Sequence, residues 1–132
     1  MASARYLGSH HFPTLPQWIG TLNVRAESVA ARMGFVLQSW DDEGLGEAVG
    51  FACQLPSGRI VLVEEHPYSI EQLGGTGVDI SADLTEVARD GPAAILREAL
   101  GCLGLSSADV SQVPDAEAQS IARETLAKIV KP

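Results

Sequence analysis

Apolar residues in the first quarter of the chain recur at spacings of three and four positions. This period predicts an amphipathic helix over residues 14–33, with Thr14 as N-cap and Pro16 in the first turn, where a missing N–H costs little. Gly20 and its neighbours are weak helix formers, which leaves open a shorter helix from Asn23. The apolar stripe consists of Trp18, Ile19, Leu22, Ala26, Val29, Ala30 and Met33.

Shorter apolar runs in the middle of the chain predict β-strands. Residues 49–55 and 60–64 flank Pro-Ser-Gly-Arg at 56–59, a tight-turn sequence, so this segment is expected to form a β-hairpin. Four consecutive apolar residues at 60–63 indicate a central strand covered on both faces. Strict alternation over 78–84 predicts a half-exposed strand whose outer face is acidic.

Two further strands are expected, over residues 5–12 and 35–40, and a loop is expected after the latter. Residues 35–40 are rich in β-branched and aromatic side chains, which favours a strand. A short first strand is predicted over 5–12. The polar, glycine-bearing run at 41–47 is predicted to be a loop.

Helical spacing returns in the last third of the chain. A helix is predicted to start at Asp90 or Gly91, with Pro92 in its first turn and a stop at Gly104. Asp115 is the expected N-cap of a final helix. The two apolar stripes are Ile95, Leu96, Ala99, Leu100 and Leu103, then Ala118, Ile121, Ala122, Leu126, Ile129 and Val130.

The element order is therefore β-α-β-β-β-β-α-α over one globular domain, residues 1–132. Because the strands follow one another and include a hairpin, we expect an α+β fold. Its sheet should be mainly antiparallel, with 4–5 strands and helices packed on one face. At 132 residues with 45% hydrophobic content, the chain can bury a core without a metal or disulfide.

Cysteine usage and hydropathy favour a cytoplasmic protein. Cys53 and Cys102 each lie within an apolar run and form no disulfide framework, as expected for reduced thiols. The N-terminus does not read as a signal peptide, and no apolar run approaches the length of a membrane span. No membrane association is predicted.

The net charge of −8 is concentrated in the middle of the chain. Residues 1–40 carry +2, residues 41–90 carry −9 from eleven acids and two arginines, and residues 91–132 carry −1. Such a segment repels a phosphate backbone, and no Lys/Arg cluster offsets it. Nucleic-acid binding is therefore not predicted.

Histidines and glutamates supply one candidate site for acid–base chemistry. His66 follows Glu64 and Glu65 at the end of the predicted central strand. His10 and His11 could join them, but adjacent strand residues point to opposite faces and the spacing matches no zinc pattern. A small enzyme or ligand-binding domain with a pocket around these five residues is the alternative function. Hydrogen-bonded histidines at a strand–loop junction are the simpler interpretation.

Two other motifs carry no cofactor prediction. The glycines at 74–77 precede a strand, whereas a phosphate-binding loop follows one and opens a helix. The acids at 41–47 lack the spaced ligands of a calcium loop. We expect no metal and no cofactor. An enzyme is not ruled out, but no catalytic motif supports one.

The acidic middle of the chain supports the leading hypothesis, a non-enzymatic protein-binding module. If its carboxylates meet in one exposed field, they can attract a basic partner. Immunity proteins and antitoxins neutralise basic toxins in this way, and that is the sharpest form of the hypothesis. Solubility alone is the competing explanation, and self-association as a homodimer is a third option. The predicted partner-binding residues are Asp41, Asp42, Glu43, Glu47, Asp79 and Asp83, with Trp40 or Tyr68 as aromatic anchors.

Overall fold

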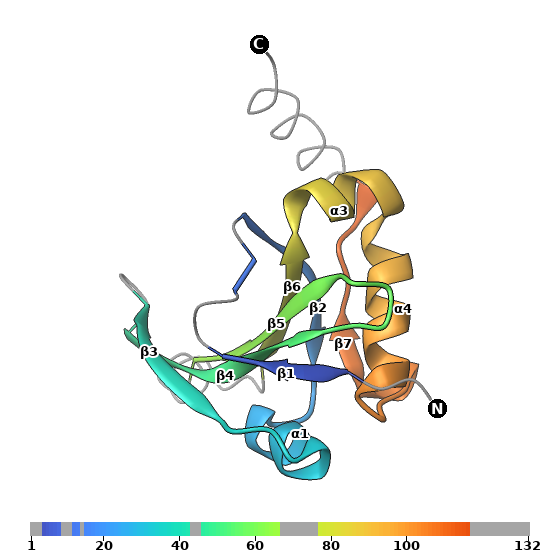
Figure 1. Cartoon of the computed structure of the whole chain (residues 1–132). Coiled ribbons are helices and arrows are strands. Elements are labelled where there is room, and N and C mark those ends of the chain that lie inside the picture. The colour runs from blue at the N-terminus through green and yellow to red at the C-terminus, as the bar shows by residue number, and fades with distance from the viewer. Residues whose placement is uncertain (1–3, 9–11, 14, 43–45, 67–76, 117–132) are drawn as a thin grey trace.

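The computed structural model of the chain describes residues 4–8, 12–13, 15–42, 46–66 and 77–116. These residues form one seven-stranded antiparallel sheet (Figure 1). The strands are β1 (Arg5–Leu7), β2 (Pro16–Leu22), β3 (Gln38–Asp42), β4 (Gly46–Gln54), β5 (Ile60–Glu65), β6 (Val78–Asp83) and β7 (Val110–Gln112).

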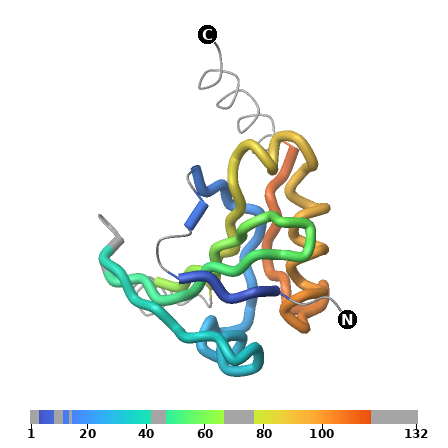
Figure 2. Tube along the Cα trace, in the orientation of Figure 1, coloured from blue at the N-terminus to red at the C-terminus, as the bar shows by residue number. Residues whose placement is uncertain are grey.

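Among the described residues, helices lie in two of the connections between these strands, β2 to β3 and β6 to β7. α1 follows β2, α3 and α4 follow β6, and a short 3-10 helix, η2, precedes β7. Figure 2 shows α4 running alongside β7 at one side of the molecule. Their bounds are α1 (Ala26–Met33), α3 (Leu84–Asp90), α4 (Pro92–Cys102) and η2 (Ser107–Asp109).

The strand order is β1-β4-β5-β6-β2-β7, and β3 also pairs with β4. β1 and β3 share one edge of the long strand β4, with Arg5 opposite Gln54 and Gln38 opposite Gly50. The pairing of β4 with β5 ends at Val49. Residues 40–42 and 46–48 therefore extend beyond β5 as a two-stranded projection, which we call the hairpin arm (Figure 1).

The main core lies between one face of the sheet and helices α1 and α4. Phe51, Val63 and Ile80 face one another across β4, β5 and β6, and all three are fully buried. Val29 of α1 and Ile95 of α4 belong to the same apolar cluster. Burial of this apolar cluster favours the layered arrangement of sheet and helices.

The predicted α+β fold with an antiparallel sheet is confirmed, and so is the hairpin of β4 and β5. Its turn uses Gly58 at a φ of 96°, a conformation that glycine adopts without strain. The predicted alternation of β6 is confirmed in its burial pattern, and α4 begins at Pro92 as expected. β5 lies between β4 and β6, as predicted for a strand buried on both faces.

The number and order of elements were predicted wrongly, because residues 16–22 form β2 and not a helix. The register of β2 shifts between Trp18 and Gly20, and the apolar residues around this bulge, Trp18, Ile19 and Leu22, have the spacing of a helical stripe. A Cβ on Gly20 would lie 3.1 Å from the Leu96 side chain, so the glycine permits α4 to approach. Only the shorter helix survives, and it starts at Ala26.

Three smaller elements also differ from the prediction. The strand expected at 35–40 lies at Gln38–Asp42, so part of the expected loop at 41–47 is paired. α3 begins at Leu84, the last residue of the alternating run, because Asp83 caps a helix there. β7 is three residues long and largely exposed, so it has no apolar pattern. The final helix expected from Asp115 lies almost wholly outside the described residues.

No helix in the part of the chain that the structure describes is both long enough and apolar enough to cross a bilayer.

Candidate functional site

Glu65, one of the acids that charge analysis grouped together, has a structural role. Its side chain is buried and accepts hydrogen bonds from Arg25 Nε at 3.0 Å and Arg25 Nη2 at 2.8 Å. It also accepts the backbone N–H of Ala26, the first residue of α1, at 3.0 Å. The hydrogen bonds and charge of Glu65 raise the pKa of Arg25. Glu65 thus fixes the end of β5 to the positive end of α1.

A second set of acids is neutralised where the β4–β5 turn meets α3 and α4. Arg59 contacts Asp90 at 2.8 Å and Glu98 at 2.9 Å, and Arg89 contacts Asp90 at 2.8 Å. Hydrogen bonds from Arg89 and then Arg59 lower the pKa of Asp90 to about 2. We call these four residues the arginine-paired region.

Glu98 also accepts the backbone N–H and the hydroxyl of Ser57 in the turn, at 3.0 and 2.7 Å. Partial burial raises the pKa of Glu98, but hydrogen bonds from Ser57 and Arg59 outweigh burial and leave the pKa lowered. The carboxylate therefore ties the β4–β5 turn to α4 in its ionised form.

Asp41 and Glu47, the two acids of the hairpin arm whose side chains the structure describes, have no such partners. Asp41 and Glu47 lie directly opposite each other in the β3–β4 pair, and both are exposed. Within the described ranges neither side chain forms an ion pair or a hydrogen bond. Like charges at directly opposed positions destabilise an antiparallel pair. Asp42 pairs with Gly46 through the backbone, and Glu43 lies outside the described residues.

Of the two predicted aromatic anchors, Trp40 and Tyr68, the structure describes only Trp40. Trp40 lies on the hairpin arm between Ser39 and Asp41, so its side chain points to the other face from theirs. Its ring packs edge-on against Phe12 at a centroid distance of 4.9 Å and remains partly exposed. Tyr68 lies outside the described residues.

A second pair of opposed acids lies at the centre of the sheet. Glu64 on β5 faces Asp79 on β6. Asp79 Oδ1 accepts a hydrogen bond from the hydroxyl of Thr21 at 2.8 Å. Thr21 Oγ1 in turn accepts the indole N–H of Trp18 at 3.0 Å. Glu64 Oε1 lies 3.9 Å from His66 Nε2. The structure thus brings Glu64, Asp79 and His66 to one region.

The five residues of the predicted alternative pocket are only partly described, and one of those described, Glu65, faces away from the others. Glu65 alternates with Glu64 along β5 and belongs to the helix-covered face, where Arg25 and Ala26 bind it. His10 and His11 lie outside the described residues. No group of three or more His, Cys, Asp or Glu able to hold a metal ion occurs among the residues described.

The acids expected to form one field are divided between the two faces of the sheet. Glu47 lies on the same face of β4 as Phe51, the face that the helices cover, and Asp41, opposite it on β3, points to the same face. Glu64 and Asp79 alternate to the opposite face. Asp83 caps α3 by accepting the N–H of Thr85 at 2.9 Å. The register of the strands, which charge counting does not reveal, decides this division.

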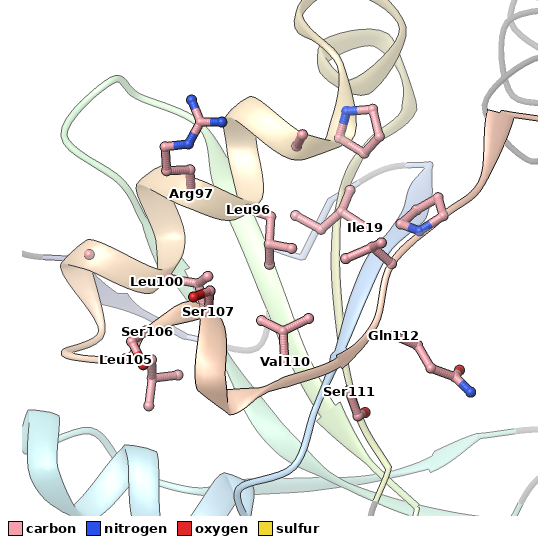
Figure 3. Close-up of a pocket in the computed structure, with 15 residues that line it drawn as sticks. Ile19, Leu96, Arg97, Leu100, Leu105, Ser106, Ser107, Val110, Ser111 and Gln112 are labelled. Carbon is pink, nitrogen blue, oxygen red and sulfur yellow. The ribbon is translucent and has the colours of Figure 1, made fainter.

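A feature that sequence reasoning missed is an apolar groove between α4 and β7, with a volume of about 810 Å³ (Figure 3). Its floor includes Ile19, Leu96 and Leu100, and Val110 and Val113 line the β7 side. These residues come from three separate elements, so no local pattern announces the groove. The one sign of the groove in the sequence is the pair Val110 and Val113, two apolar residues that the predicted core does not include.

The cysteines offer no reactive thiolate. Both are free; burial raises the pKa of Cys53 to about 12 and also raises the pKa of Cys102. A nucleophilic cysteine requires the opposite shift.

The features with functional content are therefore the opposed acids of the hairpin arm, the Glu64–Asp79–His66 group and the apolar groove. Each must be interpreted from its own geometry. Comparison of the chain with protein families, with characterised proteins and with solved structures found no match.

Proposed function

We propose that this protein is a non-enzymatic binding module whose hairpin arm recognises a basic protein partner. In its sharpest form it is an immunity or antitoxin-type protein that neutralises a basic toxin. The observation that carries the proposal is the pair Asp41 and Glu47, opposed and exposed with no cation beside them in the described chain. Most other acids of the described middle segment have an arginine or a hydrogen-bonding role.

The physical argument rests on how the chain treats its carboxylates. Three acids that serve the fold, Glu65, Asp90 and Glu98, are compensated by Arg25 or Arg59 at 2.8–2.9 Å. At the arm the fold accepts repulsion between two opposed carboxylates. A Lys or Arg of a partner placed beside them would relieve that repulsion and steer the encounter. The destabilisation of the free protein thereby becomes a contribution to binding.

Trp40 gives the arm an apolar contact surface in addition to its charge. The ring is partly exposed and is held by Phe12, so it loses little conformational freedom on binding. The proposal places the protein in the cytoplasm, which the two free cysteines support.

Partner capture with matched variants tests the proposal. Glu47→Gln and Glu27→Gln remove the same charge by the same chemistry, but only Glu47 belongs to the arm, whereas Glu27 is an exposed residue of α1. Wild type, both single variants and Asp41→Asn/Glu47→Gln are immobilised and exposed to native host extract at low and high salt. We expect a basic protein that wild type and Glu27→Gln retain, that the double variant releases, and that salt elutes. If no protein is retained in an arm-dependent way, the proposal is wrong.

A second candidate function is ligand binding or acid–base chemistry at His66. The observation that favours it is the 3.9 Å approach of Glu64 Oε1 to His66 Nε2, with Asp79 opposite Glu64. A carboxylate beside an imidazole can orient it for proton transfer. His66→Gln separates the two candidates, because partner capture by the arm should survive this change. Loss of capture in His66→Gln, with the fold intact by circular dichroism, would favour the His66 site.

A further inference from the structure

The groove between α4 and β7 presents an apolar surface that the described residues leave uncovered. Val113 is 59% exposed, and Val110 and Leu105 are partly exposed at the margin. Leu96 and Leu100 line the same hollow from α4 (Figure 3). An apolar hollow of about 810 Å³ bordered by polar side chains is the usual mark of a site where another element packs.

The position of the groove at the end of the described chain indicates its occupant. Pro114 is one of the residues that line the groove, and Ala116, two positions later, is the last residue that the structure describes. The last described residues of the chain therefore lie at the groove. Only residues 113–115 separate the end of β7 from Ala116, and connections of this length commonly return a helix onto the strand that precedes it.

The sequence of residues 117–132 contains an apolar stripe that suits an apolar groove. Ala118, Ile121, Ala122, Leu126, Ile129 and Val130 recur at helical spacing and make one apolar stripe. An isolated helix of this length is marginal in water, so its stripe needs an apolar surface to bury. As a helix, residues 116–131 would be about 24 Å long, enough to cover the roughly 16 Å of α4.

We propose that the groove between α4 and β7 is the docking site of the chain's own C-terminal segment, residues 117–132. Covalent attachment at the rim of the groove makes docking an intramolecular event with a high effective concentration. This advantage favours the segment over a second copy or an unrelated partner at ordinary protein concentrations. The elements that form the groove, α4 and β7, lie across the molecule from β3 of the hairpin arm, so the inference does not depend on the proposed function (Figure 1).

The test uses the full chain, a truncation after Ala116, and two substitutions in the segment. Leu126→Asp places a charge in the apolar stripe, whereas Ser120→Asp places the same charge on the opposite side of the helical pattern. The fluorescent dye 1-anilinonaphthalene-8-sulfonate reports exposed apolar surface, and hydrogen exchange of residues 103–114 reports cover of the groove. Light scattering gives the oligomeric state, and circular dichroism confirms that each variant is folded.

The full chain and Ser120→Asp should bind little dye and protect residues 103–114, as monomers. Truncation and Leu126→Asp should each raise dye fluorescence severalfold and speed exchange in the same residues. If the truncated protein does not fold, Leu126→Asp against Ser120→Asp still decides the question. Equal dye binding by the full chain and Leu126→Asp would overturn the proposal. A dimer that dissociates on truncation or in Leu126→Asp would also overturn it, and would assign the groove to a second copy.

Discussion

The arginine-paired region and the hairpin arm use the same chemical group, the carboxylate, in opposite ways. In the arginine-paired region, Arg59 binds both Asp90 and Glu98, and the three side chains join the β4–β5 turn to the helices. On the hairpin arm, Asp41 and Glu47 oppose each other without a cation among the described residues. The negative charge of this chain therefore has two parts: one stabilises the fold, and the other has no role in it.

The largest expected effect comes from Glu65, which like Asp90 and Glu98 is paired with an arginine. Glu65→Ala removes its bonds to Arg25 and leaves the N–H of Ala26 without its partner. We expect the free energy of unfolding to fall by about 2 kcal/mol, measured by urea denaturation. Glu64→Ala, one position earlier on the other face, is the control and should cost less than half as much. Equal losses of unfolding free energy in the two variants would show that the hydrogen bonds of Glu65 do not stabilise the fold as proposed.

Asp83 separates an acid that caps a helix from an acid that provides charge. Asp83→Ala removes the acceptor for the N–H of Thr85 and should lower the free energy of unfolding by about 1 kcal/mol. Asp83→Asn removes the charge but keeps a good cap, so its stability should stay close to wild type. Thermal denaturation of both variants checks this. If Asn costs as much as Ala, the charge matters more than the cap.

The pH dependence of stability should reveal the arginine-paired region. The pKa of Asp90 is lowered to about 2 from an ordinary 3.8, so the ionised form is favoured in the folded state. Its contribution to stability is complete above pH 3.8 and is lost as pH falls toward 2. In Arg59→Met the pKa of Asp90 should move up toward its ordinary value, and less stability should be lost in this window. NMR titration of the Asp90 carboxyl measures the shift; an unchanged pKa would show that Arg89 alone sets it.

The smallest expected effect on stability is at the hairpin arm, and it has the opposite sign. Asp41→Asn/Glu47→Gln removes a repulsion between opposed residues and should raise the free energy of unfolding by about 0.5 kcal/mol at low salt. The gain should shrink at high salt because exposed charges are screened. Glu27→Gln, near the N-terminus of α1, should be neutral or slightly destabilising. A loss of stability in the double variant would mean that these acids serve the fold.

Much of the fold followed from local patterns in the sequence. The hairpin of β4 and β5 was predictable because Pro56 and Gly58 encode its turn, and β6 was predictable because it alternates strictly. β2 was not, because the bulge at Ile19 imitates the spacing of a helix. That error depends on how β2 pairs with β6, which is a long-range property.

The candidate site was only partly predictable, for a related reason. The acids were identified by composition, but their division between the faces depends on the register of β3, β4 and β5. One signal was present and overlooked: Val61, Val63 and Glu65 share one face of β5, so Glu65 had to point into the core. The groove required three distant elements to meet, and its one signal in the sequence was the pair of valines at 110 and 113.

The most direct test of the binding proposal is the ionic-strength dependence of the association rate with the captured partner, compared between wild type and Asp41→Asn/Glu47→Gln. Steering by the hairpin arm predicts that the wild-type rate falls steeply with salt, while the double variant associates more slowly and responds less to salt. Identical rates and identical salt dependence in the two proteins would contradict the account.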